Sequence, residues 1–201
     1  MEPLGEAVAV TVDVSLSLRE KDFKPSRIHA ARQASLKLVK TLLERDIHTL
    51  VGLIVFYKYA FPILDLTDNN RLAEEAVEEI KVLGEATSPG LAVGEAVDML
   101  RHAPTGYGRR IVMVTDGTFN EGVELDVAAG LAARSGITID VLSFGNLSSY
   151  DREMIEIACK KTGGVWLHAS NMEQLLGYAA ELGYRVPGST ERRRGGVAVW
   201  R

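Results

Sequence analysis

The chain has 201 residues, of which 46% are hydrophobic and 25% charged, and its formal net charge is -4. This composition is typical of one globular domain with its own core; the negative charge argues against nucleic-acid binding by the domain, and a single cysteine excludes a disulfide framework or a cysteine-rich zinc site. The sequence shows no secretory signal, and its longest apolar run, at 50–57, is too short to span a bilayer, so we expect a cytoplasmic protein without membrane contact.

Apolar, β-branched runs alternate with segments of helical periodicity along the chain. In chain order they predict a strand at 7–12, a helix at 25–44, strands at 48–56 and 59–66, helices at 71–81 and 91–101, a strand at 111–117, a helix at 123–135, a strand at 138–144, a helix at 151–161, a strand at 165–168 and a helix at 172–184. Pro62 has no N–H to donate and therefore suits an edge strand, while Asp68 suits the cap of the next helix.

Strands that alternate with helices of this length predict an α/β fold. We expect a doubly wound, mostly parallel six-stranded sheet, Rossmann-like, with helices on both faces and one antiparallel edge strand. This domain is predicted to occupy residues 1–186. Residues 187–201 are predicted to form a flexible basic tail, which carries Arg192, Arg193, Arg194 and Arg201 against Glu191. Its role, as a solubilising linker or as a contact for phosphate or an acidic partner, stays open.

Polar side chains follow two of the predicted central strands. Asp13, Ser15 and Ser17 come after the first strand, and Asp116 ends the strand at 111–117. The carboxyl ends of parallel strands meet at one edge of a sheet, where the loop GEATSPG at 84–90 can bring the hydroxyl of Thr87. Two carboxylates and three hydroxyls are hard oxygen ligands. They favour Mg²⁺ or Mn²⁺.

These motifs, DVSLS at 13–17, Thr87 and VTDG at 114–117, resemble the metal-ion-dependent adhesion site of von Willebrand factor A domains. The resemblance runs from about Ala7 to Tyr184. It implies that Ser15, Ser17 and Thr87 bind the metal directly, while Asp13 and Asp116 act largely through water. It also implies that a partner protein supplies a Glu or Asp carboxylate to the metal. Ser88, beside Thr87, stays open as the ligand from this loop.

The segment REKDFKPSR at 19–27 resembles two branches of this family, the von Willebrand A subunit of the transcription and repair factor TFIIH and the ubiquitin receptor of the proteasome lid. The resemblance implies an adaptor or subunit of a larger intracellular assembly, of the DNA-repair and transcription type or the proteolysis type. The charged residues at 19–24 are expected either to form part of its docking face or to be an ordinary solvated loop. The sequence does not indicate an oligomeric state.

Enzyme functions are less well supported by the sequence. There is no G-x-S-x-G elbow, and no histidine follows Ser15 or Ser17 at a spacing that would make it their base. We therefore expect a non-catalytic interaction module. The alternatives are an adaptor for an AAA+ ATPase of the MoxR or chelatase type, a metal-dependent phosphotransfer enzyme and a metal-free structural scaffold.

Overall fold

The computed structural model describes residues 3–117, 119–187, 191–194 and 197–200. The strands are β1 (Gly5–Asp13), β2 (Thr49–Phe56), β3 (Ala60–Thr67), β4 (Tyr107–Thr115), β5 (Ile137–Phe144), β6 (Trp166–Ala169), β7 (Glu191–Arg194) and β8 (Val197–Trp200). The helices are α1 (Arg27–Glu44), α2 (Asn70–Glu78), α3 (Pro89–Leu100), α4 (Leu125–Arg134), α5 (Ser149–Thr162) and α6 (Met172–Tyr184), with a short 3-10 helix, η1 (Leu16–Arg19), after β1.

Six strands form one mixed sheet in the order β3-β2-β1-β4-β5-β6. All neighbouring pairs are parallel except β2 and β3, so β3 is the antiparallel edge strand, and Pro62 lies in it. This confirms the predicted fold class. The strand order reverses at β1, because β2 lies on one side of it and β4 on the other. In open α/β sheets, ligands bind outside the carboxyl ends of the strands at such a switch point.

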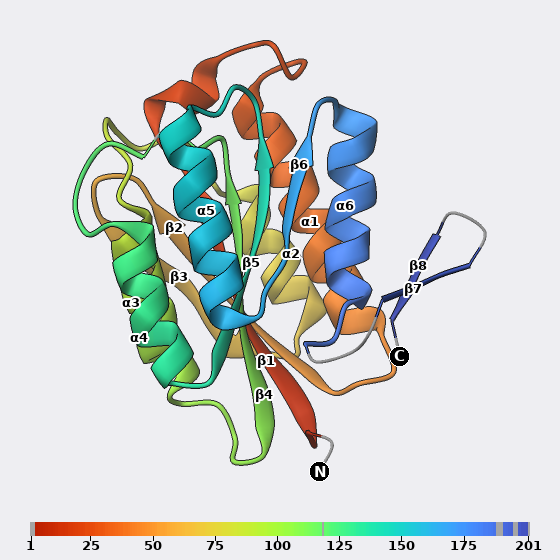
Figure 1. Cartoon of the computed structure of the whole chain (residues 1–201). Coiled ribbons are helices and arrows are strands. Elements are labelled where there is room, and N and C mark those ends of the chain that lie inside the picture. The colour runs from red at the N-terminus through yellow and green to blue at the C-terminus, as the bar shows by residue number, and fades with distance from the viewer. Residues whose placement is uncertain (1–2, 118, 188–190, 195–196, 201) are drawn as a thin grey trace.

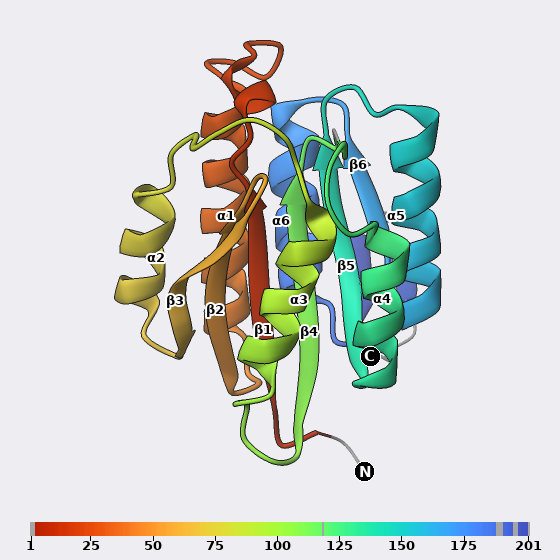
Figure 2. The same cartoon turned by 90° about the vertical axis from the view of Figure 1, so that its left-hand side faces the viewer.

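Helices cover both faces of this sheet (Figure 1). Apolar side chains of α1, α2 and α6 pack on one face, and those of α3, α4 and α5 pack on the other. In Figure 2, α3 and α4 lie in front of the strands, and α1 and α6 lie behind them. The central strand β1 is buried along its whole length, since both of its faces are covered. Within the described residues, no helix is long and apolar enough to cross a membrane.

Of the helices α1 to α6, only α6 begins at its predicted residue, and the others begin one or two residues away from it. Helix α1 begins at Arg27, with Ser26 as its N-cap accepting from the N–H of His29, so Pro25 lies before the helix and not in its first turn. The prediction that Asp68 caps the next helix was wrong. Asn69 caps α2, and its side chain accepts from the N–H of Leu72 at 3.1 Å. Both residue types cap helices well, so the choice depends on where the chain turns after β3.

A buried ionic cluster lies at the amino ends of the strands. Arg110 contacts Glu6 at 3.1 Å and Asp140 at 3.3 Å, and Arg185 contacts Asp140 at 2.7 Å. Arg45, which follows α1, pairs with Glu6 as well. Asp140 and the side chain of Arg110 are fully buried. This cluster joins β1, β4 and β5 to the ends of α1 and α6. It lies toward the amino ends of the strands, and the predicted metal site lies at their carboxyl ends.

Beyond α6, strands β7 and β8 pair with each other in an antiparallel ladder, separately from the main sheet. The side chains of the predicted basic tail, Arg192 to Arg194 and Arg201 included, lie outside the described residues. The division into a domain at 1–186 and a flexible tail at 187–201 stays a prediction.

Candidate metal centre

The first strand ends in a tight turn that is built by Asp13. Its Oδ1 accepts a hydrogen bond from the backbone N–H of Ser15 at 2.9 Å. Such side-chain capture of a nearby N–H is typical of aspartate in turns. The 3-10 helix η1 follows at once, and it brings the hydroxyls of Ser15 and Ser17 to 3.0 Å from each other. Asp13 and Ser15 are buried, whereas Ser17 is partly exposed. The cluster therefore opens to solvent at Ser17.

The neighbouring strand β4 ends beside Asp13. Thr115 donates from its hydroxyl to Oδ2 of Asp13 at 2.8 Å, and that hydroxyl accepts from the N–H of Gly117 at 2.9 Å. Gly117 has φ of 80°, and a Cβ there would meet Cδ2 of Leu147 at 1.8 Å. Only glycine fits this turn, because both the backbone conformation and the close packing exclude a side chain. The turn leaves Asp116 fully buried between Thr115 and Gly117.

The loop before α3 lies beside the turn after β1. Leu83 donates its N–H to the carbonyl of Val14 at 2.9 Å, and Gly84 forms a parallel bridge with Ser15. Further along, the N–H of Thr87 donates to Oδ1 of Asn120 at 2.9 Å. The loop is therefore held on one side by the segment after β1 and on the other by the segment after β4.

Residues 86–88 have an unusual local structure. Ala86 has φ of 66°, a strained conformation for a residue with a Cβ, and Thr87 follows it. Ser88 is the N-cap of α3, but its hydroxyl makes no capping hydrogen bond. That hydroxyl is buried without a hydrogen-bond partner among the described residues, and it lies 2.0 Å from where a Cβ of Gly122 would be. The Ser88 hydroxyl therefore packs against Gly122, in the segment between β4 and α4.

Arg27 joins this cluster from the start of α1. Its Nη1 donates to Oδ2 of Asp116 at 3.0 Å, and Nε and Nη2 donate to the two carboxylate oxygens of Asp22 at 2.8 Å each. Nη2 also lies 2.8 Å from the carboxylate of Glu20. Burial opposes the charged form of Arg27, but its hydrogen bonds to Asp22 and Asp116 hold its pKa above the ordinary value. The hydrogen bonds between Arg27 and Asp22 also lower the pKa of Asp22.

Two carboxylates are buried close together in this cluster. Burial, and then the neighbouring charge of Asp116, raise the pKa of Asp13 to about 7, although the hydrogen bonds from Ser15 and Thr115 act in the opposite direction. Oδ1 of Asp116 is buried and has no hydrogen-bond partner among the described residues. An unpaired buried carboxylate oxygen is costly, and a cation beside it would remove that cost.

The residues present fit a divalent cation bound by oxygen. The unpaired Oδ1 of Asp116 and the raised pKa of Asp13 both indicate a place where positive charge would be stabilised. Within the described part of the chain, no group of three or more histidine, cysteine, aspartate or glutamate side chains could hold a metal ion. The cluster has only two carboxylates and otherwise hydroxyls, a ligand set that suits hard cations such as Mg²⁺.

The structure brings together most of what the sequence predicted for this site. Asp13, Ser15 and Ser17 are joined by hydrogen bonds, and Asp116 acts on Asp13 electrostatically. The loop of Thr87 lies against the same turn. That these five residues bind a metal, and that Thr87 and not Ser88 is the loop ligand, stay predictions.

Sequence reasoning missed three residues that shape the cluster: Arg27, Thr115 and Asn120. Arg27 lies 89 residues from Asp116 in the chain, and nothing local to either residue indicates their contact. Thr115 immediately precedes Asp116, so a hydroxyl next to the strand-end carboxylate was a signal that could have been used. Asn120 had no such signal, because its partner is the backbone of a distant loop.

Comparison with known proteins agrees with the fold. A sequence model of the von Willebrand factor type A domain matches residues 8–118. A UPF0353 protein of Nocardia farcinica is 28% identical in an alignment 202 positions long, gaps included. The alignment covers 84% of this chain and 59% of that protein. A UPF0353 protein of Mycolicibacterium gilvum is 26% identical, with 84% and 56% covered. The chain thus spans only part of the length of these curated relatives.

Solved structures with the same fold include two proteins that are 25% identical to this chain. BatB from Bacteroides thetaiotaomicron has a TM-score of 0.77 and covers 89% of this chain and 97% of its own. An aerotolerance-related membrane protein from Bacteroides fragilis has a TM-score of 0.74, with 89% and 98% covered. The SpRpn10 VWA domain, at 18% identity and a TM-score of 0.73 over 86% of this chain and 94% of its own, shows likeness of fold alone.

Proposed function

The chain belongs to the von Willebrand factor type A domain family, and we propose that it is a non-catalytic, Mg²⁺-dependent protein-interaction module. Its contact surface would be the sheet edge at the carboxyl ends of β1 and β4. The observation that carries this proposal is the buried pair Asp13 and Asp116, of which Asp116 has one oxygen without a hydrogen-bond partner among the described residues.

In this proposal, Ser15, Ser17 and Thr87 hold the cation through their hydroxyls, and Asp13 and Asp116 act largely through water. Neutral hydroxyls donate little charge, so the cation would keep a strong attraction for an anionic oxygen. Mg²⁺ takes about six ligands, and this cluster offers at most five side chains. A Glu or Asp side chain of a partner protein is the simplest group to complete the shell.

The metal is tested by its effect on stability. A ligand present at about 100 times its Kd adds about 2.7 kcal/mol to the free energy of unfolding, which is about 5–10 °C in Tm for a domain of this size. We expect Mg²⁺ or Mn²⁺ to raise the Tm of the protein by this order, and Asp13→Asn and Ser15→Ala to remove the rise. Asp98→Asn, at an exposed position on α3, is the control that should keep it. No rise at any millimolar concentration of either ion would contradict the proposal.

The interaction is tested with the partner. Affinity purification from the native cell, with the protein as bait, should recover partners in Mg²⁺ and lose them in EDTA. A Ser15→Ala bait should fail in both buffers while folding normally. A partner that still binds in EDTA and still binds the Ser15→Ala bait would show that the protein docks through another surface.

The wider assembly is a further part of the proposal. The curated relatives are UPF0353 proteins, so membership of a repair, transcription or proteolysis assembly rests on the segment 19–27 alone. The cytoplasmic location stays a prediction as well, since the B. fragilis neighbour is described as a membrane protein. Identification of the purified partners would decide between these assemblies and an ATPase adaptor.

A further inference from the structure

The loop between β1 and α1 presents three cationic side chains to solvent. Arg19, Lys21 and Lys24 are exposed, and we call these three residues the basic rim. Within the part of the chain that the structure describes, none of the three side chains has an ion pair or a hydrogen bond. The rim begins two residues after Ser17, so it borders the point where the candidate metal centre opens. This loop follows β1 at the upper end of Figure 1.

The acidic residues of the same loop do not balance these charges. Glu20 and Asp22 alternate with the cations in sequence, but their carboxylates lie 2.8 Å from the buried guanidinium of Arg27. One cation on α1 therefore already neutralises part of their charge. The side chains of Glu20 and Asp22 stay 59% and 45% exposed, but both pair with Arg27, whereas the three bases of the rim have no such partner among the described residues.

The loop is also held in one conformation. Phe23 is buried, and its ring packs edge-on against Phe144 with 5.2 Å between centroids. The N–H of Arg27 donates to the carbonyl of Glu20 at 2.8 Å, and the guanidinium lies against Gly145, where a Cβ would be 3.0 Å from its Cζ. A surface that is already ordered loses little conformational entropy when a partner binds. The rim is thus better suited to docking than a loose charged loop would be.

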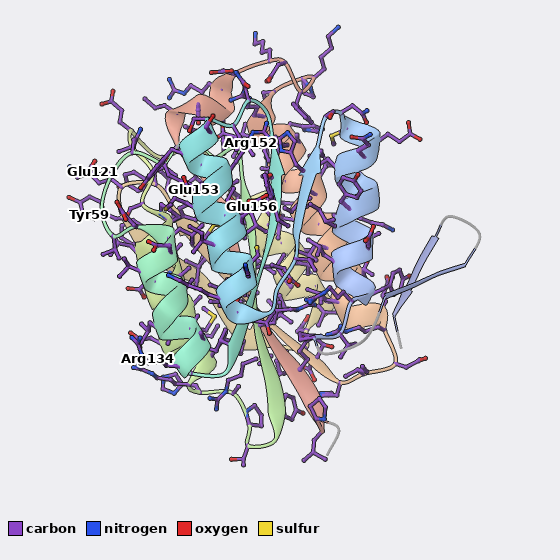
Figure 3. The ribbon with its side chains drawn as sticks, in the orientation of Figure 1. Tyr59, Glu121, Arg134, Arg152, Glu153 and Glu156 are labelled. Atoms are coloured by element: carbon purple, nitrogen blue, oxygen red, sulfur yellow. The ribbon has the colours of Figure 1, made fainter. Side chains whose placement is uncertain are left out.

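Other charged surfaces of the molecule carry both signs. On α5, Arg152 is followed by Glu153 and Glu156, and Figure 3 shows the three side chains along that helix. Lys58, in the turn between β2 and β3, pairs with Glu121 at 3.0 Å. Against a formal net charge of -4, the basic rim is therefore a local excess of positive charge.

We propose that the basic rim binds an acidic protein segment. This inference rests on the proposed function: one carboxylate of the segment completes the metal shell, and the carboxylates next to it meet Arg19, Lys21 and Lys24. Complementary charges at the edge of an interface mainly speed association and select the partner. The rim would thus select segments in which several acidic residues lie close together over those with a single one.

Nucleic acid and membrane fit the rim less well. Proteins that bind nucleic acid through phosphates commonly use about six to ten cationic contacts, and this surface has three on a negatively charged chain. Each basic residue near an anionic membrane contributes about 1 kcal/mol, so three would hold the protein only weakly. Both are kept as outcomes of the test.

The probe is a fluorescein-labelled peptide of ten glutamates, followed by fluorescence anisotropy on the full chain in Mg²⁺ and in EDTA. N-acetylglutamate amide, as an unlabelled competitor, represents a single carboxylate. We expect Lys21→Glu combined with Lys24→Glu to weaken peptide binding about tenfold and to flatten its salt dependence. The control is Lys37→Glu combined with Lys160→Glu, which changes the net charge equally at exposed positions on α1 and α5 and should retain nearly all the binding.

The outcomes separate the rim from the metal. Equal weakening of peptide binding by the Lys21 and Lys24 pair and by the control pair would overturn the inference. It would also be overturned if N-acetylglutamate amide competed as strongly, per carboxylate, as unlabelled decaglutamate does. If EDTA has no effect but the rim pair still weakens binding, the metal part of the proposed function fails and the rim stands. Tighter, rim-dependent binding of a thymidine decanucleotide or of phosphatidylserine vesicles would show that the partner class is wrong. Unchanged Mg²⁺ stabilisation of the rim variants checks that their metal centre is intact.

Discussion

Arg27 donates to Oδ2 of Asp116 at 3.0 Å, while Oδ1 of the same carboxylate is buried without a hydrogen-bond partner among the described residues. The guanidinium therefore supplies part of the positive charge that this buried carboxylate needs. A divalent cation at the candidate centre would supply the rest from the other side. Asp116 is, on this view, shared between a permanent cation of the protein and an exchangeable one.

Sharing of Asp116 predicts how an Arg27 variant responds to metal. Arg27→Met leaves Asp116 buried without its counter-ion, which is expected to lower the free energy of unfolding by about 3–5 kcal/mol in EDTA. The loss should be smaller in saturating Mg²⁺, because the metal then compensates the unpaired negative charge of the buried Asp116. Urea denaturation in both buffers measures the difference. Arg32→Met on the same helix is the control, and equal losses in the two buffers would show that Asp116 is not shared.

The pKa of Asp13, raised to about 7 from an ordinary value of 3.8, predicts a pH dependence. Without metal, folded Asp13 holds its proton more tightly than the unfolded chain does. Its contribution to stability is therefore complete below about pH 4 and is lost as the pH rises through 7, with a slope of at most about 1.4 kcal/mol per pH unit. Urea denaturation of metal-free protein from pH 4 to 8 should show this fall, and Asp13→Asn should remove it.

Metal and proton compete for Asp13, so stabilisation by Mg²⁺ should increase as the pH rises, whereas the stability of the metal-free protein decreases. It should be small at pH 5, grow through about pH 7, where Asp13 without metal is about half ionised, and level off at higher pH. Calorimetric titration of Mg²⁺ in two buffers of different ionisation enthalpy would detect the released proton. Mg²⁺ affinity that does not vary between pH 5 and 8 would contradict a role for Asp13 at the metal.

The two hydroxyls of the 84–90 loop can be separated by single substitutions. We expect Thr87→Ala to abolish the Tm rise caused by Mg²⁺. Ser88→Ala should keep it, because the Ser88 hydroxyl packs against Gly122. Thermal denaturation of both variants with and without Mg²⁺ is sufficient. The reverse result would make Ser88 the loop ligand.

The ionic cluster at the amino ends of the strands predicts a purely structural effect. Asp140→Asn removes the carboxylate that pairs with Arg110 and Arg185, and the two buried guanidinium groups then repel each other. Breaking a buried pair in this way costs about 3–5 kcal/mol of unfolding free energy. Asp98→Asn, which breaks an exposed pair with Arg101, should cost less than about 1 kcal/mol. The Tm rise on adding Mg²⁺ should survive in both variants, as long as they fold.

Much of the fold was predictable from the sequence, because each strand and helix carries its own periodicity. Continuous apolar runs mark strands buried on both faces, as in β1, and Pro62 marks the edge strand. The helix start after β3 was misplaced by one residue, since Asp68 and Asn69 are equally good caps and only the path of the chain distinguishes them. Local patterns determine elements well and their ends less well.

The candidate ligands were predictable for a similar reason: DVSLS and VTDG each stand at the end of a recognisable strand, and parallel strand ends meet at one edge. The sequence by itself thus determined the elements, the sheet edge and the oxygen-rich motifs on it. Only the tertiary structure decided the charge balance there. Arg27 meets Asp116 across 89 residues, and Phe23 anchors the loop on Phe144. In this segment of alternating signs, Glu20 and Asp22 pair with Arg27, while the basic rim stays unpaired among the described residues. Such contacts depend on which distant backbones lie side by side, and no local pattern records that.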